Sequence, residues 1–402
     1  MSILKFVALS FTSLTFCFAT GFVSKTMAAS FSVVADGLDN VRGLSFSPDG
    51  SLYVTEAGVG GDQLCDVSFN FPDQQACIGT SGAVTRIKDG KQERVLTNLP
   101  SYALSPTGSQ AIGANDIEFD AAGNPYLLIG LSASVNSDNT PNSENFGELY
   151  KVDLNTGALT SIADISSYEF AKDPTVLLPN GFVGSNPYSF TIEGDTAYIA
   201  NANRNEVLSV KLDGSNLKTL VEFPDQTLTT PTQEVKYQTV PTGVAIGPDK
   251  ALYVSQLTGV PIPSGKANIF RVGSDGKATV YAYGFTQLTD VAFDTEGNLY
   301  ALQFANEAFF RGNLDASLIK IAPDGTRTTL ISGNGLESAT ALTIGSDGAV
   351  YVSNKGDRVG VGQVLRIDPK AKVPESSSAS VVVAFAVFGV GSFIARKRRN
   401  FC

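Results

Sequence analysis

GLSFSPDGSLYV, residues 43–54, joins a strand of alternating apolar residues to a Pro-Asp-Gly turn and a second strand that carries a tyrosine. The pattern returns five more times, as DIEFDAAGNPYL from Asp116, SFTIEGDTAYI from Ser189, GVAIGPDKALYV from Gly243, DVAFDTEGNLYA from Asp290 and ALTIGSDGAVYV from Ala341. Repeats of this size indicate a fold that stacks one supersecondary unit around or along an axis.

Each copy predicts a β-hairpin. Large apolar residues alternate along the first strand, as Leu44 and Phe46 do, and Gly, Asp and Asn residues supply the turn. Two further strands follow in each repeat, for example in GELYKVDLNTGALTSIA from Gly147. Four antiparallel strands repeated six times predict an all-β fold, a six-bladed β-propeller.

The two ends of the repeat region predict how the ring closes. The sixth repeat stops after its third strand, residues 362–367, and an unassigned strand, residues 31–36, precedes the first repeat. We expect this N-terminal strand to complete the last blade, which would leave no free sheet edge. Residues 30–370 are therefore predicted to form one domain.

Charge limits the partners of this domain. Residues 30–395 hold 23 Lys and Arg against 39 Asp and Glu, a net charge of −16. The resulting field repels a nucleic-acid backbone and an anionic lipid surface, so we expect neither as a partner. Cations and neutral organic molecules are compatible with it.

Both termini predict export. Residues 1–29 contain Lys5, an apolar stretch and small residues at Ala28 and Ala29, with no acidic residue, which is typical of a signal peptide. Residues 371–402 contain Val373-Pro374-Glu375, a serine run, a 17-residue apolar segment and a basic cap. An ordinary membrane anchor is the alternative for this tail, although its length is at the short limit for spanning a bilayer.

Cysteine usage fits an exported protein. Cys17 lies in the signal and Cys402 beyond the basic cap, so the propeller keeps Cys65 and Cys77 in one loop. Two such thiols predict a disulfide, which would contribute roughly 3 kcal/mol by the chain-entropy estimate.

Loop lengths predict two different faces. The turns between first and second strands are short throughout, whereas the connections on the opposite face are long, for example residues 57–81, 98–114 and 131–146. Long insertions on a rigid scaffold commonly carry function. We therefore predict that the long-loop face is the working surface.

Alignment of the repeats places polar residues at the mouth of the channel on that face. Asp116 and Asp290 come from blades two and five, which oppose each other in a six-membered ring, and are predicted to face across the channel. Further candidates on this ligand-binding face are Arg42, Glu56, Asn115, Asn186, Tyr188 and Asn354. Carboxylate and amide oxygens suit Ca²⁺, and Asp116 and Asp290 are its candidate ligands. The alternative is that these side chains accept hydrogen bonds from loop backbone N–H groups.

The absence of histidine from all 402 residues excludes most familiar catalysis. A Ser-His-Asp or Cys-His system and a histidine general base cannot form. LSFSPDGSLYVTEAG in the first blade resembles the sorbosone and soluble glucose dehydrogenase propellers, but those rely on a histidine base. The glycines recur at hairpin turns, so no phosphate-binding loop is predicted.

The repeats resemble NHL-type blades over residues 31–368. With Asn40-Val41-Arg42-Gly43-Leu44 opening the first blade, the cysteine insertion and the tail, the chain resembles the ScyD/ScyE family of exported cyanobacterial propellers. The tail is similar to a PEP-CTERM sorting signal, with Ser376 where that motif has a second proline. This resemblance implies recognition by an exosortase, transient membrane association through the C-terminal helix, and a location in the periplasm, on the outer membrane or in the extracellular matrix.

Two functions follow as hypotheses. The favoured one is a non-catalytic exported propeller that binds a small molecule, glycan or protein through its long-loop face and assists extracellular assembly of a scytonemin-like pigment or of matrix. It needs no cofactor other than an optional Ca²⁺. The alternative is a calcium-dependent lactonase or hydrolase of the gluconolactonase or paraoxonase type, with Glu56, Asp116 and Asp290 as its candidate residues.

Overall fold

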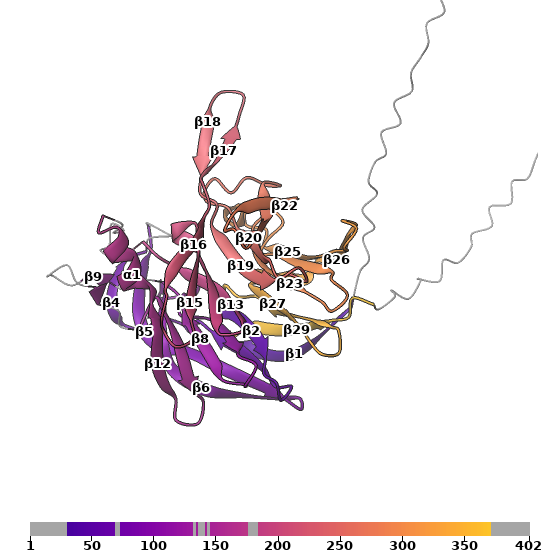
Figure 1. The fold of residues 1–402 in the computed structure, drawn as a ribbon. Coiled ribbons are helices and arrows are strands. Elements are labelled where there is room, and N and C mark those ends of the chain that lie inside the picture. Colours follow the sequence, from indigo (N-terminus) through magenta and orange to yellow (C-terminus); the bar gives the residue numbers. More distant parts are fainter. Residues whose placement is uncertain are drawn as a thin grey trace, which may run out of the picture.

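The computed structural model describes residues 30–68, 73–131, 134–135, 141–142, 145–175 and 184–370. The predicted signal peptide, the tail with Val373, Pro374 and Glu375, and Cys17 and Cys402 lie outside the described residues. Within them six of the antiparallel sheets are arranged as a six-bladed β-propeller, which confirms the predicted fold (Figure 1).

The first three blades follow the order of the repeats. Blade one consists of β2 (Val41–Phe46), β3 (Leu52–Glu56), β5 (Gln75–Lys88) and β6 (Lys91–Ser105). Blade two consists of β7 (Ala114–Phe119), β8 (Pro125–Ile129), β11 (Glu148–Asp153) and β12 (Ala158–Asp164). Blade three consists of β13 (Pro187–Glu193), β14 (Thr196–Asn201), β15 (Glu206–Lys211) and β16 (Lys218–Glu222).

The last three blades repeat this organisation. Blade four consists of β19 (Pro241–Ile246), β20 (Leu252–Gln256), β21 (Ala267–Val272) and β22 (Ala278–Phe285). Blade five consists of β23 (Leu288–Phe293), β24 (Leu299–Gln303), β25 (Asp315–Ile321) and β26 (Arg327–Glu337). Blade six consists of β27 (Ala341–Ile344), β28 (Val350–Asn354), β29 (Gly362–Ile367) and the N-terminal β1 (Phe31–Leu38).

The N-terminal strand closes the ring as predicted. β1 pairs antiparallel with β29, from Phe31 opposite Ile367 to Leu38 opposite Gly362, and becomes the outer strand of blade six. It extends two residues beyond the predicted end. This pairing joins the two ends of the propeller through backbone hydrogen bonds within one sheet.

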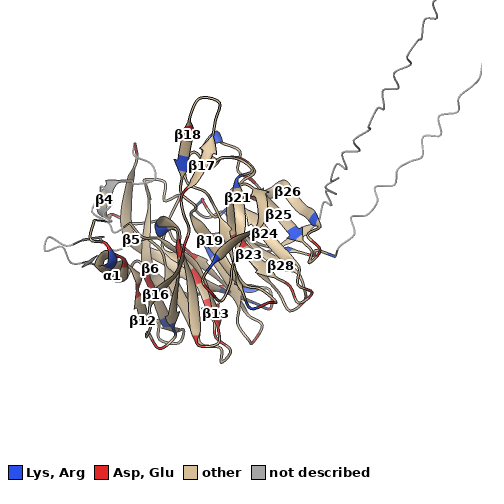
Figure 2. Cartoon of the chain, turned by 45° about the horizontal axis from the view of Figure 1, so that its top comes forward, with Lys and Arg blue, Asp and Glu red and all other residues tan. Residues whose placement is uncertain are grey.

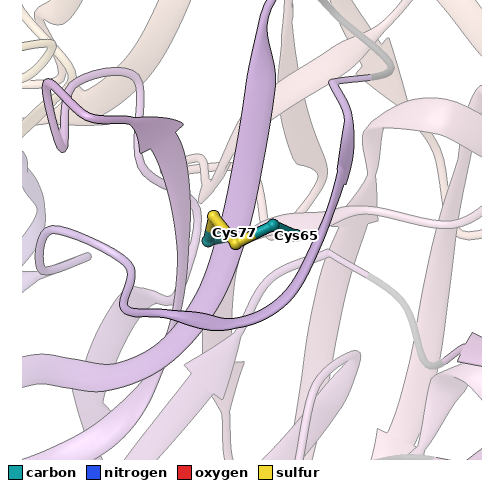
Figure 3. The surroundings of a disulfide bond; sticks show 2 residues. All are labelled: Cys65 and Cys77. Carbon is teal, nitrogen blue, oxygen red and sulfur yellow. A yellow bond between two sulfur atoms is a disulfide. The ribbon is translucent and has the colours of Figure 1, made fainter.

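Blade one differs from its prediction in the long connections. Much of residues 57–81 and 98–114 is strand, because β5 and β6 continue as a ladder from Lys88 and Lys91 out to Gln75 and Ser105. β4 (Gln63–Val67) adds to the far end of β5. The predicted disulfide between Cys65 and Cys77 is present and joins β4 to β5 (Figure 3).

The other long connections also carry local structure. The helix α1 (Ile165–Lys172) follows β12 and is capped by Asp164, whose carboxylate accepts from the Ser167 amide. The hairpin of β17 (Gln226–Thr229) and β18 (Glu234–Tyr237) projects from the body of the propeller (Figure 1). Short elements are β9 (Ser134–Val135), β10 (Pro141–Asn142), η1 (Ala202–Arg204) and η2 (Phe309–Arg311). None of the helices in the described residues is long and apolar enough to cross a membrane.

The core lies between the blades. Alternate apolar residues of the first strands, including Leu44, Ile117, Val244, Val291 and Leu342, are buried there. Most charged residues lie in loops and at strand ends, and the strands are largely uncharged (Figure 2). Acidic residues within the inner strands are therefore exceptions that need an explanation.

Candidate active site in the central channel

The six innermost strands begin on the long-loop face, and polar residues at their starts tie neighbouring blades together. Each such side chain donates to a backbone carbonyl of the next blade or of the loop leading to it. The bonds are Arg42 to Ala111, Asn115 to Pro187 (2.9 Å), Ser189 to Thr242 (2.7 Å), Thr242 to Leu288 (2.8 Å), Thr289 to Ala339 (3.0 Å) and Thr340 to Val41 (2.9 Å). These bonds form a ring around the mouth of the channel.

Asp116 and Asp290 occupy equivalent positions in β7 and β23. Asp116 accepts from its neighbour Ile117 N (2.9 Å) and from Phe190 N of blade three (2.9 Å). Asp290 likewise accepts from Val291 N (2.8 Å) and from Leu342 N of blade six (2.8 Å). Both carboxyl groups therefore accept from backbone N–H groups, which lie in strands and not in the loops of the alternative interpretation, and both link two blades.

Two glycines make room for these aspartates. A Cβ on Gly43 would lie 2.0 Å from Asp116 Oδ1 and 2.7 Å from Asp116 Cα. A Cβ on Gly243 would lie 2.4 Å from Asp290 Oδ1 and 2.5 Å from Asp290 Cα. Each aspartate thus fits between a glycine of the preceding blade and a backbone amide of the following one, so the two halves of the ring repeat one arrangement.

Glu118 is a third acidic residue of the channel, and the sequence reasoning missed it. It follows Asp116 by two positions on β7, so both side chains point to the same side of the strand. Its Oε2 accepts from Ser45 Oγ of blade one (2.8 Å). The alternation of residues in this strand could have predicted its position, because Ile117 and Phe119 alternate with Asp116 and Glu118 and point away from the channel.

Burial raises the pKa of all three carboxyl groups. Desolvation raises the pKa of Asp290 to about 7, opposed by its two backbone hydrogen bonds. Desolvation, together with the charge of Asp290 and against the hydrogen bond from Ser45, raises the pKa of Glu118 to about 7. The pKa of Asp116 is raised well above its usual value by burial and by the charge of Glu118. Near neutral pH the channel therefore holds both protonated and ionised carboxyl groups.

Two cavities adjoin these groups. The channel cavity, of about 240 Å³, runs along the inner strands toward the tight-turn face and is lined by Asp116, Glu118 and Asp290. Glu193, whose side chain is 44% exposed, also lines it, so the cavity reaches the surface. The mouth cavity lies at the long-loop end, has about 10 Å³ and shares Asp116 and Asp290 with the channel cavity.

Arg42 and Tyr188 lie at the long-loop end of the channel and line the mouth cavity. The Arg42 guanidinium donates to carbonyl groups of Gly356 and Ala111, and burial lowers its pKa. Burial also raises the pKa of Tyr188, so its phenol stays protonated at neutral pH. The channel cavity, the larger of the two, lies toward the tight-turn face, whereas the loop lengths predicted the working surface on the long-loop face.

The remaining sequence candidates lie away from both cavities. Glu56 is buried at the end of β3, where it pairs with Arg94 and accepts from Asp39 N (2.9 Å). Asn186 accepts from Leu131 N (2.9 Å), and Asn354 accepts from Glu337 N (2.8 Å). Each of these three side chains accepts a hydrogen bond from the backbone N–H of another segment: the short link between β1 and β2, the connection after β8, and the end of β26.

The predicted calcium site has no assembled ligand set. The described residues contain no group of three or more acidic, cysteine or histidine side chains arranged to hold a metal ion. Asp116 and Asp290 direct their oxygens at backbone N–H groups. A site without a cofactor, to which Ca²⁺ is optional, is compatible with this arrangement.

Comparison with known proteins extends the description of the fold. No protein-family model matches the sequence, and no curated protein matches it. The soluble aldose sugar dehydrogenase of Escherichia coli, in its apo form, matches with a TM-score of 0.52 and 13% identity over 85% of this chain and 100% of its own. A gluconolactonase of Xanthomonas campestris matches with a TM-score of 0.50 and 12% identity, over 85% of this chain and 90% of its own. At these identities the likeness shows a shared propeller fold.

The prediction of a non-catalytic binding propeller is corrected by these findings. The two solved propellers above are named as a sugar dehydrogenase and a gluconolactonase, so this fold is shared with enzymes, and the lactonase alternative fits that finding better than the non-catalytic prediction. The prediction failed because it gave most weight to the missing histidine. The fold brings together three carboxyl groups, on strands far apart in sequence, that can carry out acid–base chemistry without it.

Proposed function

We propose that this protein is a hydrolase that cleaves a small ester, preferably a cyclic ester such as a lactone, in its central channel. The observation that carries the proposal is the surface-connected cavity faced by Asp116, Glu118 and Asp290. The likeness in fold between this protein and a gluconolactonase supports the same class of reaction, the hydrolysis of an ester.

The cavity limits the substrate. Its volume of about 240 Å³ lies below the ~300–1,000 Å³ of most ligand pockets, so the substrate is a small molecule of about one ring. The residues that line it, all within the described part of the chain, include Asp116, Glu118, Glu193 and Asp290 and no lysine or arginine. A neutral or cationic substrate therefore fits, and an anionic product is expelled by repulsion.

The two groups with a pKa of about 7 take complementary roles. Ionised Asp290 accepts a proton from water as the water oxygen bonds to the ester carbonyl carbon. Protonated Glu118 then donates its proton to the leaving oxygen as the carbon–oxygen bond breaks. The products are an acid and an alcohol, joined in one hydroxy acid when the substrate is a lactone, and both carboxyl groups exchange protons with solvent.

Hydrolysis by purified full-length protein tests the proposal. γ-Butyrolactone, gluconolactone and phenyl acetate serve as substrates, each with added Ca²⁺, with EDTA and with neither. We expect turnover with a narrow pH optimum near 7, because the base must be ionised while the acid is protonated. Glu118→Gln and Asp290→Asn should each lower kcat by roughly 10²–10⁴-fold.

Glu93→Gln is the matched control, because Glu93 is exposed and pairs with Arg86 on the outer part of blade one. It should leave kcat unchanged. Failure of the wild-type protein to hydrolyse any of these esters would refute the proposal. Equal activity of Glu118→Gln and wild type would refute the role of the channel carboxyl groups.

We also propose that the protein is exported as a relative of the ScyD/ScyE propellers. The disulfide between Cys65 and Cys77 supports an oxidising compartment, and the sorting-signal-like tail supports handling by an exosortase. Cell fractionation with an antibody to the propeller tests this location. Recovery of the protein only from the cytoplasm would contradict it.

A further inference from the structure

We infer that the mouth cavity holds a single water molecule and that Asn115 positions this water for attack on a substrate in the channel cavity. This inference rests on the proposed hydrolase function. The mouth cavity has about 10 Å³, which is close to the least volume that accommodates one water. It adjoins the larger cavity, since Asp116 and Asp290 line both.

Asn115 supplies the first argument. Its side chain lines the mouth cavity and the residue is only 5% exposed. Its Nδ2 donates to Pro187 O (2.9 Å), which fixes the orientation of the amide and leaves Oδ1 as an acceptor. Oδ1 has no hydrogen-bond partner among the described residues. A buried acceptor without a partner is destabilising, so a water that donates to Oδ1 would be held there.

The other groups around the mouth cavity suit a water molecule, which is neutral and can both donate and accept hydrogen bonds. Asp116 and Asp290 present carboxyl groups, Tyr188 and Thr340 present hydroxyls, and Arg42 presents the one cation among the residues that line it. An ammonium or metal ion would be repelled by Arg42. Buried waters usually form two to four hydrogen bonds with polar groups, and the residues that line the mouth cavity include at least that many polar side chains.

The position of Asp290 connects the water to the reaction. Asp290 lines both cavities, so the group that takes the proton faces the water on one side and the substrate on the other. Asn115 touches no substrate in this arrangement and acts through the water. It is therefore a positioning residue, whose loss should lower kcat and leave KM nearly unchanged.

The propeller itself supplies the test variant. Thr242, Thr289 and Thr340 occupy the position of Asn115 in blades four to six, and each donates its hydroxyl to a carbonyl of the next blade. Asn115→Thr should therefore preserve the bond to Pro187 and the fold while it removes the Oδ1 acceptor. Thr242→Ser is the control, because Thr242 lines neither cavity and serine keeps its hydroxyl.

The experiment combines kinetics with crystal structures of the full-length wild type and Asn115→Thr. We expect a water within hydrogen-bond distance of Asn115 Oδ1 in the wild type and its loss in the variant. We also expect kcat to fall about 10²-fold in Asn115→Thr, with KM within twofold and the melting temperature within 2 °C of wild type. Thr242→Ser should match the wild type in all three.

Each other outcome has a definite meaning. An empty mouth cavity, or a metal ion within it, overturns the inference whatever the activity. An ordered water with unchanged kcat in Asn115→Thr overturns the positioning role. A wild type that hydrolyses no ester refutes the proposed function and with it the positioning role of Asn115, whereas the crystal structures still decide whether the water is bound.

Discussion

Replacing Gly43 by alanine should destabilise the propeller because the methyl group would overlap the next blade. The new Cβ would lie 2.0 Å from Asp116 Oδ1 and 2.7 Å from Asp116 Cα. The carboxyl group can rotate away, but the Cα cannot, so β2 and β7 must separate. Gly43 does not adopt the left-handed conformation, so backbone strain adds nothing to the cost.

The magnitude follows from two contributions. Overpacking costs about 3 kcal/mol at the upper end of its usual range. Displacing Asp116 from Phe190 N adds about 1 kcal/mol for one hydrogen bond. With an unfolding entropy of ~2.1 cal/mol/K per residue over residues 30–370, a loss of about 4 kcal/mol lowers the melting temperature by about 6 °C.

Differential scanning calorimetry measures this change. Gly243→Ala should behave alike, because its Cβ would lie 2.5 Å from Asp290 Cα. Gly273→Ala is the control, since its Cβ would meet only the movable end of Asp275 at 2.9 Å and of Arg271 at 3.8 Å. A melting temperature for Gly43→Ala equal to that of Gly273→Ala would show that the glycine is not required for the fit of Asp116.

Three further predictions concern stability. The pKa of Asp290 is about 7 in the folded protein and ~3.9 when unfolded, so its contribution to the free energy of unfolding is complete below pH 4 and is lost as the pH rises through 7. In urea unfolding, the free energy of unfolding of Asp290→Asn should therefore fall less steeply between pH 4 and pH 7 than that of the wild type. Replacing Cys65 and Cys77 by serine should lower the free energy of unfolding by roughly 3 kcal/mol, and dithiothreitol should then have no further effect on urea unfolding. A chain that begins at residue 39 should lose the outer strand of blade six and melt well below a chain that begins at residue 30; equal melting temperatures would show that β1 is dispensable.

The repeat pattern was enough to predict the blades and their closure. Alternation of apolar residues such as Leu44 and Phe46, together with turn residues, specifies local strands and hairpins from short-range contacts. The disulfide was also predictable, because two cysteines in one loop lie close in any fold. The extended ladder of β5 and β6 was not, because the pairing of Gln75 with Ser105 joins segments that individually resemble loops.

The candidate site was predicted only in part. Aligning the repeats placed Asp116 and Asp290 at the channel. The alternation of side chains along β7 could have added Glu118, which lies two residues after Asp116. Glu56, Asn186 and Asn354 share the same oxygen chemistry, yet in the structure each accepts from a backbone N–H of another segment, away from the channel. Residue type alone cannot tell a side chain that lines the channel from one that binds another backbone segment, because both roles depend on which groups the side chain meets across the fold.

By itself the sequence determined the architecture of this protein, since strand periodicity and turn chemistry act over a few residues and repeat six times. Only the tertiary structure decided which polar side chains meet, how deeply they are buried and where the channel reaches the surface. Burial sets the pKa of Asp290 and Glu118, and burial is a property of the closed ring rather than of any one blade. For that reason the fold could be predicted from the repeat, whereas the acid–base chemistry appeared only once six blades enclosed the channel.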